Sequence, residues 1–220
     1  MSAETQNAEP NEGQPLAKPD RHAILPDHSL EQLFRGARTF YSWEERDVSD
    51  TTLRALYELL QFGPTSANQS PARFLFLKGE SQEKLRPHLI EPNIEKTLTA
   101  PVTVVVAWDW NFHDKIPDLF PHNPEAKEWF ASDEARFENG FRNSSLQGAY
   151  LIMAARALGL DCGPMSGFDK EGVDETFFKN DPEMGAWRSN FLCNIGYGTT
   201  DKLFPRLPKL SFEAGAKILK

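Results

Sequence analysis

The fold is decided by the stretch Val102-Thr103-Val104-Val105-Val106-Ala107-Trp108, which follows Pro101. Its residues are β-branched or apolar at positions that would face both sides of a strand. This pattern is typical of a central strand that is covered on both faces. It is also the longest apolar run in the chain, and it is too short to cross a membrane as a helix.

Helical and strand-like segments alternate outward from this strand. A capping box of Ser29 and Gln32 predicts a first helix, and Ser49 predicts the cap of a second helix that stops at Gly63-Pro64. The other predicted elements are strands at 73–77 and 191–197, an interrupted helical region over 81–99, and helices over 133–158 and 171–178. Helices that come first, followed by strands separated by helices, predict an α+β fold or a three-layer α/β/α sandwich.

Composition divides the chain into a tail and one domain. Residues 1–20 contain one Leu and no aromatic residue, so the prediction is a disordered or extended tail over 1–26 that only a partner chain could order. Residues 27–220 contain no internal repeat and no linker, which predicts a single domain. Within it, the aromatic, irregular stretch 109–132 is expected to be either a packed excursion or a lid over a ligand.

Several function classes are disfavoured by composition and by missing motifs. A formal net charge of −8 argues against binding to nucleic acid or to an anionic membrane. Neither dinucleotide fingerprint is present, nor are HExxH and GxSxG, and the five histidines form no ligand cluster. Cys162 and Cys193 are interpreted as buried small apolar groups. No signal peptide is recognised, so we expect a cytoplasmic protein. Because the motifs above are missing, we also expect no metal site and no catalytic side chain.

What remains is a set of loops rich in amide, hydroxyl and guanidinium groups. They contain Arg38 with Thr39, Ser66 with Asn68, Asn93, and Arg206 with Lys209. Each of them alone is typical of a solvated loop or a local turn. Together they could bind an elongated, polyhydroxylated phosphate, with the cations at the phosphate and the amides along the rest of the ligand.

These stretches resemble the nitroreductase family of FMN enzymes from about Ser29 to Lys220. Ala37-Arg38-Thr39-Phe40-Tyr41 matches the segment that holds the phosphate and ribityl chain, with fewer cations than is usual. Pro64-Thr65-Ser66-Ala67-Asn68-Gln69-Ser70-Pro71-Ala72 matches the loop beside the flavin ring, with Ser70 in place of Gln and Ala72 in place of Trp. The resemblance implies FMN contacts from Arg38, Thr39, Pro64, Ser66, Asn68, Asn93, Pro164, Met165, Ser166, Gly167, Arg206 and Lys209.

A finer resemblance concerns one branch of the family, the malonic semialdehyde reductases of pyrimidine-nitrogen use, also called 3-hydroxypropanoate dehydrogenases. It rests on segments such as Gly63–Asn68, Thr97–Val102, Phe141–Ser145 and Gly163–Asp169. It implies that NADH or NADPH delivers hydride to flavin N5, and that 3-oxopropanoate, a small carbonyl substrate, then takes the hydride in a ping-pong cycle. Arg142 would be the carboxylate anchor if it faces the pocket; otherwise it is a surface arginine.

The resemblance also implies an intertwined homodimer with FMN at the subunit boundary. The predicted helix 133–158 is apolar around much of its circumference, so it has to be covered on more than one side. Two other functions remain open. The protein could be an FMN enzyme that reduces nitro or quinone compounds or uses oxygen, or a flavin-binding dimer without catalytic activity.

Overall fold

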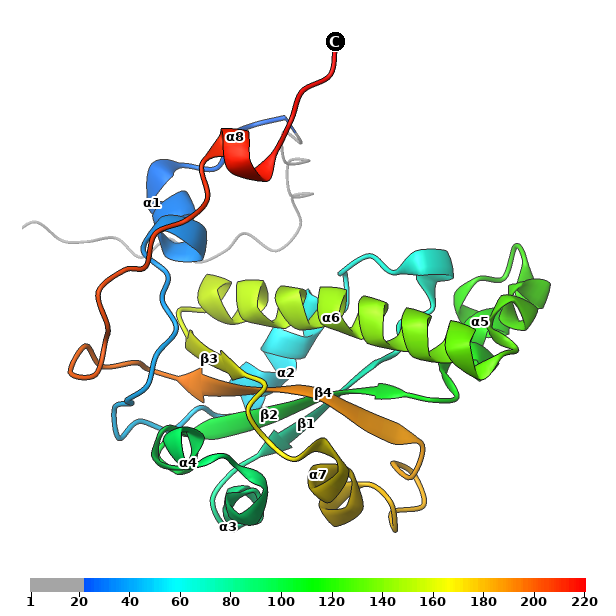
Figure 1. Cartoon of the computed structure of the whole chain (residues 1–220), viewed down its shortest axis with the longest axis horizontal. Helices are drawn as coiled ribbons and strands as arrows, with labels where there is room; N and C mark the ends of the chain where they lie inside the picture. The colour runs from blue at the N-terminus through cyan, green and yellow to red at the C-terminus, as the bar shows by residue number, and fades with distance from the viewer. Residues whose placement is uncertain (1–21) are drawn as a thin grey trace, which may run out of the picture.

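A four-stranded antiparallel sheet forms the middle of the molecule (Figure 1). We describe residues 22–220 of a computed structural model of the chain; most of the predicted tail, residues 1–21, lies outside the described residues. The strand order is β1-β2-β4-β3, and the sheet therefore has β2 and β4 at its centre. The strands are β1 (Ala72–Leu77), β2 (Val102–Asp109), β3 (Asp161–Met165) and β4 (Trp187–Gly196).

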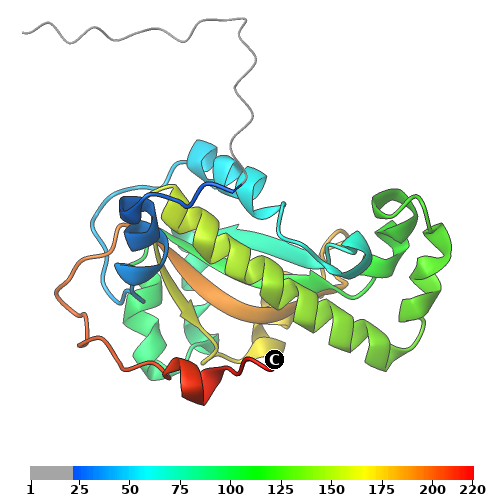
Figure 2. The same ribbon diagram turned by 90° about the horizontal axis from the view of Figure 1, so that it is seen from above.

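Helices cover both faces of the sheet, with α2 and α6 on one side and α3, α4 and α7 on the other (Figure 1). In Figure 2, α6 lies across the sheet and the C-terminal segment runs along the outside of the sandwich. The α-helices are α1 (Asp27–Leu30), α2 (Asp50–Leu60), α3 (Glu80–Glu83), α4 (Glu91–Leu98), α5 (Ile116–Leu119), α6 (Asp133–Ala157), α7 (Lys170–Phe177) and α8 (Phe212–Gly215). Among the described residues, no helix is long and apolar enough to span a membrane.

Strand β2 explains why the sandwich has three layers. Val102, Val104 and Val106 are buried in the apolar cluster shared with α2 and α6. Val105 and Ala107 point the other way, into the cluster shared with α7 and the α3–α4 region. Because successive strand residues face opposite sides, an uninterrupted apolar run can supply two cores at once. The predicted central strand and the predicted α+β sandwich are confirmed.

Two details of the predicted elements are wrong. The first helix begins at Asp27 with Pro26 at its N-cap position, and Ser29 caps nothing; the side chain of Gln32 instead donates to the carbonyl of Arg156 at 2.6 Å. The segment 161–165 lies between the predicted helices 133–158 and 171–178, where the sequence predicts only a Gly/Pro-punctuated connection, and it is strand β3. Ser49 was predicted correctly, since its hydroxyl accepts from the backbone N–H of Thr52 at the start of α2.

The aromatic stretch between β2 and α6 is a packed excursion. It contains two 3-10 helices, Phe112–Lys115 and Pro124–Phe130, with α5 between them. Phe112, Ile116, Ala126 and Phe130 form a small cluster of their own, separate from the two cores of the sheet. The stretch is therefore packed on itself, and its role as a lid over a ligand stays a prediction.

Candidate functional site

Cationic side chains gather where the connection after the first helix meets the C-terminal segment. Arg38 and Thr39 line a cavity of about 620 Å³ together with Arg156, Arg206 and Lys209. The Arg38 guanidinium donates to the carbonyl of Phe204, and that of Arg206 donates to the carbonyl of Ala37 at 3.4 Å. The two predicted cationic segments, far apart in the chain, are thus side by side. Nε of Arg156 is buried in this region and has no hydrogen-bond partner in the part of the chain that the structure describes.

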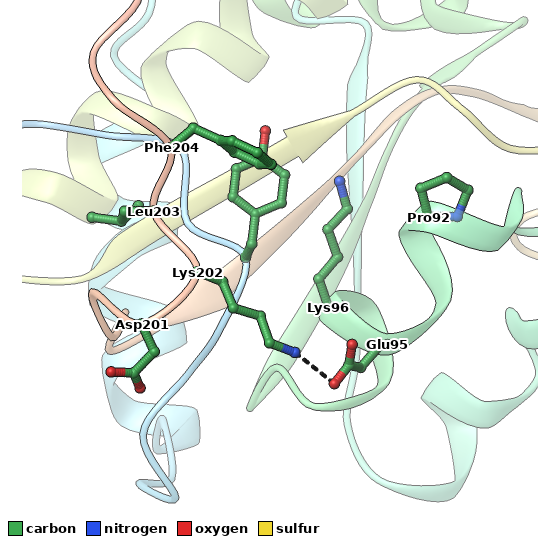
Figure 3. A pocket seen from close by; sticks show the side chains of 8 residues that line it. Pro92, Glu95, Lys96, Asp201, Lys202, Leu203 and Phe204 are labelled. Carbon is green, nitrogen blue, oxygen red and sulfur yellow. Dashed lines mark hydrogen bonds and ion pairs between the residues drawn. The ribbon is translucent and has the colours of Figure 1, made fainter.

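A second cavity, of about 460 Å³, adjoins the first. It is lined by residues of α4 and of the C-terminal segment, and Figure 3 shows Lys96 pointing from α4 toward Phe204. Tyr41 and Phe204 line both cavities, and their rings meet edge to face with centroids 5.6 Å apart. The two cavities therefore share Tyr41 and Phe204 as lining residues, and the guanidinium groups all line the first.

Asn93 and Gly167 are in contact beside the second cavity. Asn93 is 6% exposed on α4, and its amide donates to the carbonyl of Gly167 at 2.8 Å. A Cβ at residue 167 would lie 2.4 Å from Cδ1 of Ile90 and 2.8 Å from the Asn93 amide nitrogen. Only glycine allows this approach. Pro164 and Met165 end β3 just before it, Met165 accepting from the Thr97 hydroxyl at 3.4 Å, and Ser166 is exposed.

Lys96 is a site residue that the sequence interpretation missed. Its ammonium lies 4.8 Å from the centre of the Tyr41 ring, and within residues 22–220 it makes no other polar contact. The carboxylate of neighbouring Glu95 forms an ion pair with the ammonium of Lys202, at 2.6 Å. Burial lowers the pKa of the Lys96 ammonium, because removing a charge from water favours the neutral form. The sequence could have indicated Lys96, because Asn93 and Lys96 are three residues apart and share a helix face.

The predicted loop with Pro64, Ser66 and Asn68 lies elsewhere in the same chain. The Ser66 backbone N–H donates to Asn143 in the first half of α6, at 2.9 Å, and the Asn68 amide donates to the carbonyl of Leu119 in the excursion, at 2.8 Å. Asn143 and Arg156 are thirteen residues apart on α6, which is roughly 20 Å along a helix. One chain does not bring this loop to the cationic cavity.

Arg142 also lies away from the two cavities. It is on the exposed face of α6 and forms an ion pair with Glu138, one turn earlier. Its neighbour Asn143 holds the Ser66–Asn68 loop, so Arg142 belongs to the same region of the molecule as that loop.

The residues gathered in the two cavities suit binding more than side-chain catalysis. The guanidinium and ammonium groups of Arg38, Arg206 and Lys209 could hold a phosphate, and the ammonium of Lys96 could hold a polar edge of a ring. Asn93 lines neither cavity, and its amide nitrogen donates to the carbonyl of Gly167. No Ser-His or Cys-His pair is among the residues of these cavities. Within residues 22–220 no group of three or more metal-binding side chains is found.

Comparison with known proteins identifies the fold. Residues 34–197 match the model of the nitroreductase family. A Bacillus subtilis protein described as a nitroreductase superposes with a TM-score of 0.78 at 17% identity, over 88% of this chain and 100% of that one. A second, from Exiguobacterium sibiricum and solved in complex with FMN, gives 0.76 at 20% identity, over 86% and 96%. A Staphylococcus epidermidis protein described as an NAD(P)H:FMN oxidoreductase gives 0.73 at 17% identity, over 86% and 95%.

Proposed function

The chain belongs to the nitroreductase family, and from this we propose that it is an FMN-dependent oxidoreductase with NADH or NADPH as its electron donor. The proposal takes support from two structural relatives, one solved with FMN and one described as an NAD(P)H:FMN oxidoreductase. We further propose that its substrate is malonic semialdehyde, which it reduces to 3-hydroxypropanoate.

The observation that carries the proposal is the pair of adjoining cavities with different chemistry. FMN has a phosphate, a hydroxylated chain and a flat ring with polar edges, in that order. The cavity with Arg38, Arg206 and Lys209 fits the phosphate, and the buried Nε of Arg156, which has no partner, is one more donor there. The second cavity offers the ammonium of Lys96 for the ring, with the amide of Asn93 beside it. The donors thus follow the order of the groups of FMN.

In this proposal the protein binds and orients, and the cofactor reacts. When bound, FMN supplies the hydride chemistry, taking hydride from the nicotinamide at N5 and giving it to the acceptor. Asn93, fixed by its bond to the Gly167 carbonyl, orients one edge of the ring. Lys96 places a half-buried positive charge beside it, and such a charge favours added negative charge on the ring more strongly than it would in water.

We propose that the working form is a homodimer whose second subunit completes the site. The loop with Pro64, Ser66 and Asn68 is too far from the cationic cavity to join it within one chain. α6 also exposes large apolar side chains, which are Phe137, Phe141, Leu146 and Tyr150. The C-terminal segment exposes Leu207, Leu210 and Ile218 by 71–79%. A twofold contact that buries these faces would bring the loop, with Arg142, to the partner's cavities.

Malonic semialdehyde as the substrate rests on the finer sequence resemblance and on Arg142. Among residues 22–220, Arg142 is paired only with Glu138, on the solvent face of α6, so its guanidinium could turn to a substrate carboxylate at a dimer boundary. An arginine at that boundary would favour small acids over neutral nitroaromatic compounds.

Two measurements test the proposal. The purified protein should be yellow, and NADPH or NADH should bleach the flavin absorbance under anaerobic conditions. In steady-state measurements, kcat/KM should then be higher for malonic semialdehyde than for a nitroaromatic compound. Arg142→Met should remove that preference while leaving bleaching by the nicotinamide intact. A protein that neither retains FMN nor is bleached would disprove the proposed function, and a higher kcat/KM for the nitro compound would disprove the substrate.

A further inference from the structure

Asn194 is a fully buried amide near the end of strand β4. It lies on β4 between Cys193 and Ile195, and its exposed fraction is 0%. A buried amide destabilises a protein unless its polar atoms have partners. Both polar atoms of Asn194 have them: Oδ1 accepts from the hydroxyl of Thr103 at 2.9 Å, and Nδ2 donates to the carbonyl of Lys96 at 2.9 Å. Nδ2 also donates to the hydroxyl of Thr97 at 3.4 Å, so the strand carries a polar side chain directed at the last turn of α4.

The carbonyl of Lys96 receives a second buried donor. Nε1 of Trp43, from the segment that follows Arg38 and Thr39, donates to the same oxygen at 2.9 Å. Trp43 is 9% exposed, so neither donor competes freely with water. Two side chains from separate parts of the fold thus converge on the main chain of the residue whose ammonium reaches into the second cavity.

The rest of the network fixes Asn194 itself. Thr103, which donates to Asn194, accepts from Nε2 of Gln82 at 2.8 Å. The same nitrogen of Gln82 contacts the carbonyl of Ala100 at 3.0 Å. The last four carbonyls of a helix have no partner within the helix. Buried side chains reach two of these carbonyls in α4: Trp43 and Asn194 donate to that of Lys96, and Gln82 donates to that of Thr97. This turn cannot shift without breaking several buried hydrogen bonds.

We infer that Asn194 is a positioning residue, which holds the main chain of Lys96 and so fixes the Lys96 ammonium over the cavity beside Tyr41. The inference rests on the proposed function, in which that ammonium lies beside the flavin ring. Asn194 touches neither cavity and acts only through α4. A Lys side chain has four rotatable bonds, so a fixed main chain is needed to keep its charge within a narrow volume.

The test compares the flavin midpoint potential in variants of the full-length FMN-loaded protein. Asn194→Leu removes all three hydrogen bonds of the amide, with Thr103, Lys96 and Thr97, at nearly constant volume. We expect the ratio of affinities for reduced and oxidised FMN to fall about tenfold, which is about 30 mV for a two-electron couple. Asn190→Leu is the matched control: it is on the same strand and 5% exposed, but its amide donates to Ser144 and Ser145 of α6. Its potential should equal that of the wild type.

A double-mutant cycle separates positioning from general structural damage. If Asn194 acts through Lys96, Asn194→Leu should shift the potential in the wild type and have no further effect in Lys96→Met. Equal shifts in both backgrounds would overturn the inference, as would a wild-type potential in Asn194→Leu. If Asn194→Leu does not fold, Trp43→Phe takes its place in the test. This variant removes the other hydrogen bond to the Lys96 carbonyl and keeps an aromatic ring. The same outcomes then support or overturn the inference. A wild type that binds no FMN would instead contradict the proposed function.

Discussion

Gly167 can lie close to α4 because it has no side chain. Its carbonyl accepts from Asn93, and its α-carbon lies so close to α4 that an added Cβ would approach Ile90 and Asn93 within 3 Å. We expect Gly167→Ala to push Asn93 out of position, to weaken FMN binding by at least about tenfold, and to lower the free energy of unfolding by about 1–3 kcal/mol, the usual effect of overpacking. Fluorescence titration with FMN and urea unfolding measure the two effects.

Gly215→Ala is the control for that substitution. Residue 215 is exposed, and an added Cβ would meet only Leu210, at an ordinary 3.8 Å. It should bind FMN like the wild type. Wild-type affinity in Gly167→Ala would mean that Asn93 makes no contact with the cofactor.

The cationic cavity gives a prediction about charge. If Arg206 and Lys209 bind the phosphate, Arg206→Ala and Lys209→Ala should each weaken FMN binding by about 1.5–3 kcal/mol, roughly ten- to hundredfold in Kd. Lys209 is the cleaner probe, since Arg206 also holds the carbonyl of Ala37. The control is Arg86→Ala, an exposed arginine paired with Glu83. Unchanged Kd in both test variants would place the phosphate elsewhere.

Element boundaries show which parts of the fold can be predicted from local sequence. The central strand and helices α2 and α6 were predictable, because periodicity and caps are local signals. Strand β3 was not, because Gly163 and Pro164 are typical of a loop. β3 is an edge strand of the sheet, however, paired with β4 and otherwise joined only by an isolated bridge between Thr39 and Cys162 among residues 22–220, and proline is tolerated in edge strands.

The two serines proposed as caps give a matched pair of variants. Ser49 accepts from the N–H of Thr52, so Ser49→Ala should lower the free energy of unfolding by about 0.5–2 kcal/mol. Ser29 lies inside α1 and accepts nothing, so Ser29→Ala should change it by less than about 0.5 kcal/mol. Urea unfolding at unchanged slope measures both. A larger effect at Ser29 would restore the capping box that the sequence suggested.

The candidate site could be predicted only in part because its residues come together through the whole fold. Arg38 and Arg206 are adjacent through contacts between the two ends of the domain. Lys96 depends on partners from β2, β4 and the segment after Arg38, and none of these is visible in the sequence around it. The Ser66–Asn68 loop is recognisable by its residues, but its distance from the cavity follows from the sheet and α6.

The exposed face of α6 gives the prediction for the whole molecule. Leu146 is 48% exposed there, and a charge in an apolar interface is strongly unfavourable. Leu146→Glu should yield a monomer that loses FMN, because ligand and partner stabilise the same state. Asn180→Glu, just after α7 on the opposite side of the sheet, adds the same charge and should stay a dimer. Sedimentation and flavin absorbance over a dilution series measure both, and a monomer that keeps its FMN would refute the shared site.

The order of the strands has a consequence for how the chain folds while it is being synthesised on the ribosome. β2 is complete at Asp109, but its central partner β4 begins only at Trp187. At about 5–20 residues per second, translation of the intervening chain takes roughly 4–16 s. During that interval β2 has β1 on one edge and no strand on the other, and exposed edges of β-branched, apolar strands are prone to aggregate. Slower translation should therefore lengthen the exposure of the nascent chain and increase its demand for chaperones.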